Sequence, residues 1–265
     1  SEALPRELGG RCSASFGGQT INFAPIPLAR EALGDAVETD PVLGEPRLYL
    51  EGTLVDGQNA NGEGARTPIR FVGRDEFREH IEILEGSHGD GAYIDEYASD
   101  FMNLSPGGEL MFTPLGEEPQ TIQVTAVYRN LYESQRHPYW CSLEQITLRN
   151  ALGELPPLIV LIDPEEFSDD PALFDSLFAQ YATSLGDWEI PVSIEGLTVS
   201  GARDAAATLE HANQVIHDEA EEVPAFFARP NLVSDLTLVS DRVEILSNAL
   251  RTSILPLAGV VIFAA

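Results

Sequence analysis

Residues 91–130 read GAYIDEYASDFMNLSPGGELMFTPLGEEPQTIQVTAVYRN and carry the clearest structural signals of the chain. The apolar pair Tyr93 and Ile94 leads into a short helical run over 95–102. Residues 106–108, Pro-Gly-Gly, predict a turn, because proline fixes φ and glycine permits a positive φ. The first part of the stretch therefore predicts a strand, a short helix and a turn, in that order.

Two further strands are predicted after this turn, over 109–113 and over 121–129. In the second of them, every other residue is apolar: Ile122, Val124, Ala126 and Tyr128. Period-two alternation bounded by turn residues is typical of a strand with one buried face. On pattern alone, the stretch is a small antiparallel β module.

A strand–helix–strand unit precedes this stretch. Strands over 11–16 and 44–55 flank a helix over 28–38, in which apolar residues recur at three- and four-residue spacing. The polar residues 56–67, DGQNANGEGART, are expected to form a flexible surface connector, because they offer almost no apolar side chain for burial. A strand over 68–73 follows.

A second unit of the same kind follows the stretch. The run LIVLI at 158–162 predicts a strand that is buried on both faces. A helix is predicted over 170–186, because Asp-Pro suits a helix start and Gly suits its end. A strand over 188–194 and a second helix over 203–222 complete the unit.

The charge of the chain restricts its partners. It has 43 acidic residues and 15 basic residues, all of them arginine, for a formal net charge of -28. Such a field repels phosphate backbones and anionic lipid headgroups, so nucleic-acid binding is not expected. The composition suits a solvated surface in salty or cation-rich surroundings.

The last residues, 254–265, read ILPLAGVVIFAA and are apolar throughout. They are too few to span a bilayer, which takes about 20 residues. Two interpretations fit: a buried terminal strand or helix, or the start of a membrane span.

The order of elements resembles the extracytoplasmic domain of FtsX-like and MacB-like ABC transporter permeases. In that family, a helix is followed by a Leu-x-x-Gly-Asp segment, a strand and a second strand. Here Leu104, Gly107, Gly108 and Glu109 stand in the first segment, and residues 126–128, Ala-Val-Tyr, stand in the second strand. The sequence departs from the pattern in having Glu109 for aspartate and Gly108 as an intervening residue.

The resemblance implies an α+β fold in which two βαβ-like halves form a membrane-proximal base around an inserted β-rich lobe. The first half takes residues 1–56 and the second takes 151–225. The inserted lobe takes 57–150. Residues 226–265 are then a helix that leads into a truncated transmembrane span.

The resemblance also implies a function without chemistry of its own. A cytoplasmic ATPase subunit hydrolyses ATP, and the domain couples this to movement, or to handling of a partner or cargo, on the extracytoplasmic side of the cell membrane. The implied partners are that ATPase subunit, a second permease copy and an extracytoplasmic partner or cargo of unknown identity. The main alternative is a secreted or membrane-anchored binding module.

A hydrolase is the less favoured alternative. Its candidate carboxylates are Asp163, Glu165 and Glu166, which directly follow the predicted buried strand, where ligand sites of α/β sheets lie. No nucleophile and no glycine-rich cradle accompanies them. Walker A, Gly-x-Ser-x-Gly and His-Glu-x-x-His motifs are absent, and no catalytic residue, metal site or cofactor is predicted.

The chain has two cysteines, Cys12 and Cys141, far apart in the sequence. In a cytosolic protein, two buried free thiols are the ordinary expectation, whereas an exported protein favours a disulfide. Because the resemblance implies export, we expect Cys12 and Cys141 to form a disulfide between the first strand and the end of the inserted lobe.

Overall fold

The computed structural model describes residues 13–19, 25–114, 118–131, 138–143, 157–168, 173, 177–178, 185–191, 193, 199–222 and 231–233. Its strands are β1 (Ser13–Gln19), β2 (Arg47–Asn59), β3 (Thr67–Arg74), β4 (Ile83–Gly86), β5 (Ala92–Asp95), β6 (Glu109–Phe112), β7 (Gln120–Tyr128), β8 (Leu158–Ile162), β9 (Leu185–Pro191) and β10 (Asn231–Val233). Its helices are α2 (Pro25–Val37), α3 (Glu96–Met102) and α6 (Val199–Glu222), with short 3₁₀ segments η1 (Phe77–His80), η2 (Pro138–Leu143) and η3 (Pro164–Ser168).

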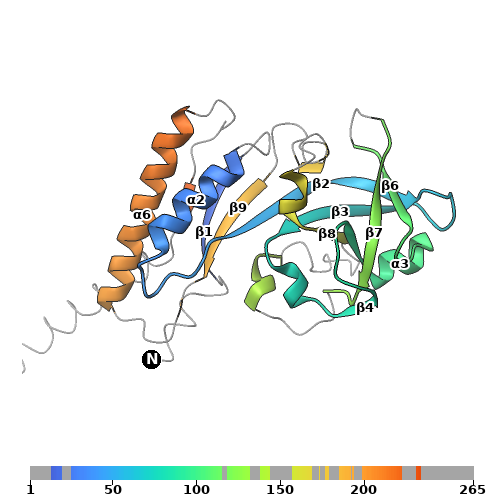
Figure 1. Cartoon of the computed structure of the whole chain (residues 1–265), viewed down its shortest axis with the longest axis horizontal. Helices are drawn as coiled ribbons and strands as arrows, with labels where there is room; N and C mark the ends of the chain where they lie inside the picture. Colours follow the sequence, from blue (N-terminus) through green and yellow to red (C-terminus); the bar gives the residue numbers. More distant parts are fainter. Residues whose placement is uncertain are drawn as a thin grey trace, which may run out of the picture.

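All of these strands belong to one sheet, in the order β10-β1-β9-β2-β3-β8-β5-β7-β4, with β6 paired to β2 and β7. Figure 1 shows α2 and α6 together at one end of the molecule and α3 at the other. Strand β2 runs between these ends. Its residues 47–51 pair with β9, and its residues 57–59 pair with β6. At about 3.3 Å per residue, its 13 residues extend over about 40 Å.

Strand β8 confirms the prediction of a strand that is buried on both faces. All five of its residues are buried. It lies between β3, to which it is parallel, and β5, to which it is antiparallel. Val160 belongs to the apolar cluster on one face of the sheet and Ile159 to the cluster on the other face. Alternate side chains of β8 thus enter the core on opposite faces of the sheet. A strand in this position needs apolar residues throughout.

The stretch 91–130 folds largely as predicted, with one correction. Strands β6 and β7 are antiparallel, and the predicted turn at 106–108, with Gly107 at φ +88°, lies between α3 and β6. However, β5 pairs with β7 in the parallel sense, with Ile94 opposite Val127. The expectation of a purely antiparallel module is therefore wrong. The helix α3 connects β5 to the following strands, and a crossover of this kind allows a parallel pair.

The fold is mixed α and β around a continuous sheet, in agreement with the predicted α+β class. The sheet crosses the proposed domain limits: β2 passes through the limit at 56/57. Strand β8, within the proposed second half at 151–225, pairs with β3 and β5. The division into 1–56, 57–150, 151–225 and 226–265, and the arrangement of two halves around a lobe, stay predictions.

Residues 60–66, between β2 and β3, are not the flexible connector that the polar composition predicts. Asn59 Nδ2 donates to the carbonyl of Asn103 at 2.7 Å, and the Ala65 amide donates to the carbonyl of Phe101 at 2.7 Å. At Gly64, whose φ is +73°, a Cβ would lie 2.2 Å from the Met102 carbonyl carbon. Hydrogen bonds to α3 thus replace apolar burial and fix this turn.

Helix α3 begins at a buried aspartate. The side chain of Asp95 caps the helix by accepting from the Ala98 amide at 2.7 Å, and the residue is 1% exposed. Burial raises the pKa of Asp95 from 3.8 to about 6, although the Ala98 amide acts in the opposite direction. The folded protein therefore binds the Asp95 proton more tightly than the unfolded protein does. The unfolding free energy consequently falls as the pH rises from about 4 to about 6, where the folded protein loses this proton.

We expect Asp95→Asn to raise the unfolding free energy at pH 7 by about 2–3 kcal/mol, because asparagine also caps helices and carries no charge. The gain should disappear below about pH 4, where the carboxyl of the wild-type protein is protonated in both states. Chemical denaturation of both proteins from pH 4 to pH 7 measures the difference. The matched control is Asp100→Asn, at an exposed position of the same helix. A pH-independent difference at Asp95 would contradict the prediction.

Within the described ranges, no helix is long and apolar enough to cross a membrane. The predicted start of a span at 254–265 lies outside these ranges. So does most of the helix predicted over 170–186, and Gly186, its predicted end, lies in β9. The helix predicted over 203–222 is confirmed as α6.

Candidate functional site

The two ends of the molecule meet at a group of charged and aromatic side chains that we call the junction: Arg30, Arg74, Asp75, Tyr139 and Glu189. The last residue of β3, Arg74, and the residue after it, Asp75, provide its centre. Both are buried, at 1% and 8% exposure. Since buried charges require partners, the contacts of these two residues define the site.

Arg74 joins strand β3 to strand β9 and to the segment η2. Its Nη2 forms an ion pair with the carboxylate of Glu189, which is 7% exposed, and also donates to the carbonyl of Tyr139 at 2.5 Å. The guanidinium lies over the Tyr139 ring, 4.2 Å from its centroid. A planar guanidinium can make a charged contact at its edge and an aromatic contact on its face at the same time.

Asp75 joins the same corner to helix α2. Its Oδ2 accepts from the Leu48 amide at 2.7 Å, and its Oδ1 accepts from Arg30 at 2.9 Å. The guanidinium of Arg30 also lies 5.4 Å from the ring centroid of Trp188 on β9. Burial raises the pKa of Asp75, and the Leu48 amide and Arg30 oppose that rise. The carboxylate therefore connects a helix at one end of the sheet to the strands that lead to the other end.

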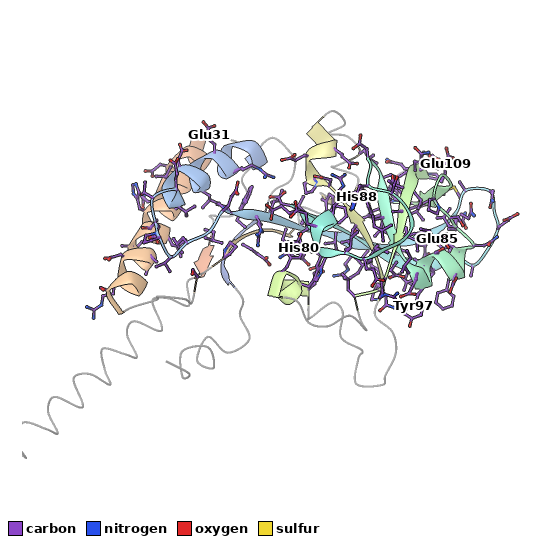
Figure 2. All side chains as sticks on the ribbon, turned by 60° about the horizontal axis from the view of Figure 1, so that its bottom comes forward. Glu31, His80, Glu85, His88, Tyr97 and Glu109 are labelled. Carbon is purple, nitrogen blue, oxygen red and sulfur yellow. The ribbon has the colours of Figure 1, made fainter. Side chains whose placement is uncertain are left out.

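Segment η2 covers the junction with aromatic rings. The Tyr139 hydroxyl donates to the carbonyl of Asp75 at 2.5 Å, and burial raises the pKa of that hydroxyl. The ring of His80 stacks on the Tyr139 ring at 3.8 Å, and Trp140 Nε1 donates to the carbonyl of His80 at 3.0 Å. Figure 2 shows His80 in the middle of the molecule. The aromatic rings thus cover the buried arginine on this face of the sheet.

A second charged group contains two of the three carboxylates that the hydrolase alternative requires. Arg78 of η1 donates to Asp163 at 2.6 Å, pairs with Glu166 and donates to the Tyr93 hydroxyl at 3.0 Å. The other Glu166 oxygen accepts from the Gly91 amide at 2.7 Å. These carboxylates attach the loop before β5 and the segment η1 to the end of β8.

The Arg78 group is better suited to holding structure than to acid–base catalysis. Burial raises the pKa of Glu166, while the Gly91 amide and Arg78 lower it. Both carboxylates already bind the Arg78 guanidinium, and Glu166 also accepts from a backbone amide. The third candidate, Glu165, is 73% exposed and lies 3.7 Å from Arg30, outside the Arg78 group. The structure therefore brings Asp163 and Glu166 together and leaves Glu165 apart.

The disulfide prediction falls outside what the structure describes. Cys12 is not among the described residues, and of Cys141 only the backbone is described, in η2. Cys12–Cys141 therefore stays a prediction. In the described part of the chain, no group of three or more His, Cys, Asp and Glu side chains could hold a metal ion.

The junction was not predicted from the sequence, because its partners are distant in the chain. Arg74 and Glu189 are separated by 115 positions, and Arg30 and Asp75 by 45. One signal was present: Arg74 and Asp75 directly follow the strand predicted over 68–73, as the candidate carboxylates of 163–166 follow the run at 158–162. Charged residues at the end of a strand indicate a candidate functional site, but they do not show which distant residues form ion pairs with them.

No protein-family model matches the sequence, and the search of curated proteins found no match either. Solved structures do show similarity. The periplasmic region of MacB from Actinobacillus actinomycetemcomitans aligns with a TM-score of 0.43 and 9% identity, over 89% of this chain and 95% of that chain. The extracellular domain of the noncanonical ABC-type transporter YknZ from Gram-positive bacteria aligns with a TM-score of 0.46 and 9% identity, over 84% and 100%.

A domain of a permease protein from Porphyromonas gingivalis aligns with a TM-score of 0.45 and 11% identity, over 86% of this chain and 96% of that chain. Two of these three similar structures are a periplasmic region and an extracellular domain, and the third is a permease domain.

Proposed function

We propose that the chain is the extracytoplasmic domain of an ABC transporter permease subunit. In this proposal the domain passes movement from a membrane-proximal end to a distal end. The membrane-proximal end contains α2, α6, β1, β9 and β10, and the distal end contains α3 and β4 to β7. A cytoplasmic ATPase subunit supplies the energy, and a second permease copy and an extracytoplasmic partner or cargo complete the assembly. The sequence resemblance supports the class of protein.

The observation that carries the proposed role is the continuity of β2 across the junction. This strand pairs with β9 at one end and with β6 at the other, so both ends share one backbone. Close-packed protein interiors have low compressibility and transmit strain. The ion pairs of Arg74 with Glu189 and of Asp75 with Arg30 connect the ends through side chains as well. A displacement of α2 and α6 would therefore move α3 with it.

A role without chemistry is part of the same proposal. The support is that Asp163 and Glu166 are both bound to Arg78, so that neither is offered to a substrate. The hydrolase alternative makes a different prediction: the purified chain would turn over a peptide, ester or glycan, and Asp163→Asn or Glu166→Gln would abolish that turnover.

The coupling test uses the full permease with its ATPase subunit in lipid vesicles. Spin-labelled amino acids replace Glu210 on α6 and Gln123 on β7, both of which are exposed. A third label marks the membrane-embedded part. Between the nucleotide-free and the nucleotide-trapped transporter, we expect the Gln123-to-membrane distance to change and the Glu210-to-Gln123 distance to stay constant.

A variant tests whether the junction transmits the movement. Asp75→Asn removes the ion pair with Arg30, so the distribution of Glu210-to-Gln123 distances should broaden while ATP hydrolysis continues. The control is Glu82→Gln, which removes an exposed ion pair with Arg129 at 2.7 Å and should leave the distances unchanged. If the Gln123-to-membrane distance were the same in the nucleotide-free and the nucleotide-trapped transporter, the proposal would be overturned.

A further inference from the structure

The outer surface of α3 presents an exposed aromatic ring. Among the described residues, three large hydrophobic side chains are exposed: Leu54 at 52%, Phe101 at 50% and Leu84 at 37%. Phe101 is the aromatic member. On a helix, residues three and four positions apart are neighbours, so Tyr97 lies beside both Asp100 and Phe101. Figure 2 shows Tyr97 at the outer edge of the distal end.

The turn between β2 and β3 adds a carboxylate to this surface. Asn103 Nδ2 donates to Glu63 Oε2 at 2.8 Å, and the Ala65 amide bonds the Phe101 carbonyl. Glu63 is therefore held at the C-terminal end of α3. We call Glu63, Tyr97, Asp100 and Phe101 the α3 surface. Because hydrogen bonds hold the turn against α3 before any ligand arrives, binding there would cost little backbone entropy.

The charge of the α3 surface is uncompensated within the described residues. The ion pairs given by the structure involve Arg30, Arg47, Arg66, Arg70, Arg74, Arg78 and Arg129. None of them reaches Glu63 or Asp100. The surface thus combines two carboxylates with the exposed ring of Phe101 and the half-buried ring of Tyr97, and aromatic faces attract guanidinium and ammonium groups. Both features favour a cation.

We propose that the α3 surface binds an arginine- or lysine-bearing segment of an extracytoplasmic partner protein, with a basic side chain over Phe101 and between Asp100 and Glu63. Charge complementarity favours this occupant. A second copy of the chain carries the same net charge of -28 and is repelled, as are anionic lipid surfaces and nucleic acids. A basic protein segment is attracted by the whole chain and finds specific contacts on α3.

This inference rests on the proposed function only in assigning the partner to the extracytoplasmic side. Its test is made on the complete 265-residue chain in solution, without membrane or ATPase. Failure to bind would therefore leave the coupling proposal untouched, and failure of coupling would leave the binding result untouched.

The probes are three labelled amphipathic peptides of equal length that share their leucine positions and carry arginine, glutamine or glutamate at the polar positions. Fluorescence anisotropy at one fixed salt concentration gives each Kd. We expect the arginine peptide to bind most tightly. Phe101→Ser should weaken its binding about tenfold, as expected for loss of an aromatic anchor. Phe101→Leu should weaken it about 2–5-fold, because it keeps apolar area but loses the cation–π contact.

The matched control is Leu54→Ser, which removes an equally exposed apolar side chain from β2 and should leave the Kd unchanged. Unchanged thermal midpoints verify that the variants fold. Equal affinity for the arginine and glutamine peptides would overturn the cationic assignment. Equal effects of Phe101→Ser and Leu54→Ser would show diffuse attraction instead of a site, and no binding of the arginine peptide would overturn the proposal as a whole.

Discussion

Glu189→Leu should lower the unfolding free energy by about 3–5 kcal/mol, because it leaves the charge of Arg74 buried without its carboxylate. Arg74 is 1% exposed, and its ion pair with Glu189 lies beneath the rings of Tyr139 and Trp140. Water cannot replace the lost partner at such a position. Chemical denaturation of the variant and the wild-type protein measures the loss.

The double variant separates the ion pair from its surroundings. Arg74→Met combined with Glu189→Leu removes both charges and keeps similar volumes, so we expect it to be clearly more stable than Glu189→Leu alone. Glu82→Gln is the control, since its ion pair with Arg129 is exposed and should contribute almost nothing. A double variant no more stable than the single one would show that Arg74 acts through its aromatic and backbone contacts.

Local sequence patterns predicted those helices, strands and turns that are determined by a few neighbouring residues. The run at 158–162 is apolar because both faces of β8 are covered, and the turn at 106–108 follows from its proline and glycines. The helical run predicted over 95–102 is confirmed as α3, which begins one residue later because Asp95 is its N-cap. In each case a few neighbouring residues determine the local structure, so a short window of sequence contains the information.

The partners in the sheet and in the charged groups could not be predicted in this way. The apolar pattern of β8 is the same whichever strands it joins, and its parallel pairing with β3 depends on the whole topology. Asp163 and Glu166 are the candidate carboxylates of the hydrolase alternative, but their partner Arg78 lies 85 and 88 positions away in the sequence. The polar turn 60–66 was mistaken for a flexible connector because its hydrogen-bond partners belong to α3.

Raising the KCl concentration from about 0.01 M to about 1 M should increase the unfolding free energy by about 5 kcal/mol. Two like charges 10 Å apart in water repel by about 0.4 kcal/mol. If each of the 28 uncompensated negative charges has one such neighbour, the repulsion in the folded state totals about 6 kcal/mol. The Debye length falls from about 30 Å to about 3 Å over this range, so salt removes most of that repulsion.

A charge-reduced variant distinguishes screening from other effects of salt. It carries glutamine or asparagine at six exposed acidic positions that have no ion pair in the described part of the chain: Glu31, Asp35, Glu38, Glu45, Glu85 and Glu109. We expect this variant to be more stable than the wild-type protein at low salt and to respond less to KCl, because fewer charges remain to be screened. Potassium sulfate strengthens apolar burial as well as screening, so it should stabilise both proteins further. If KCl raised the unfolding free energy of both proteins equally, repulsion among these six carboxylates would not explain the stabilisation. Specific binding of cations to the acidic surface would then have to explain it.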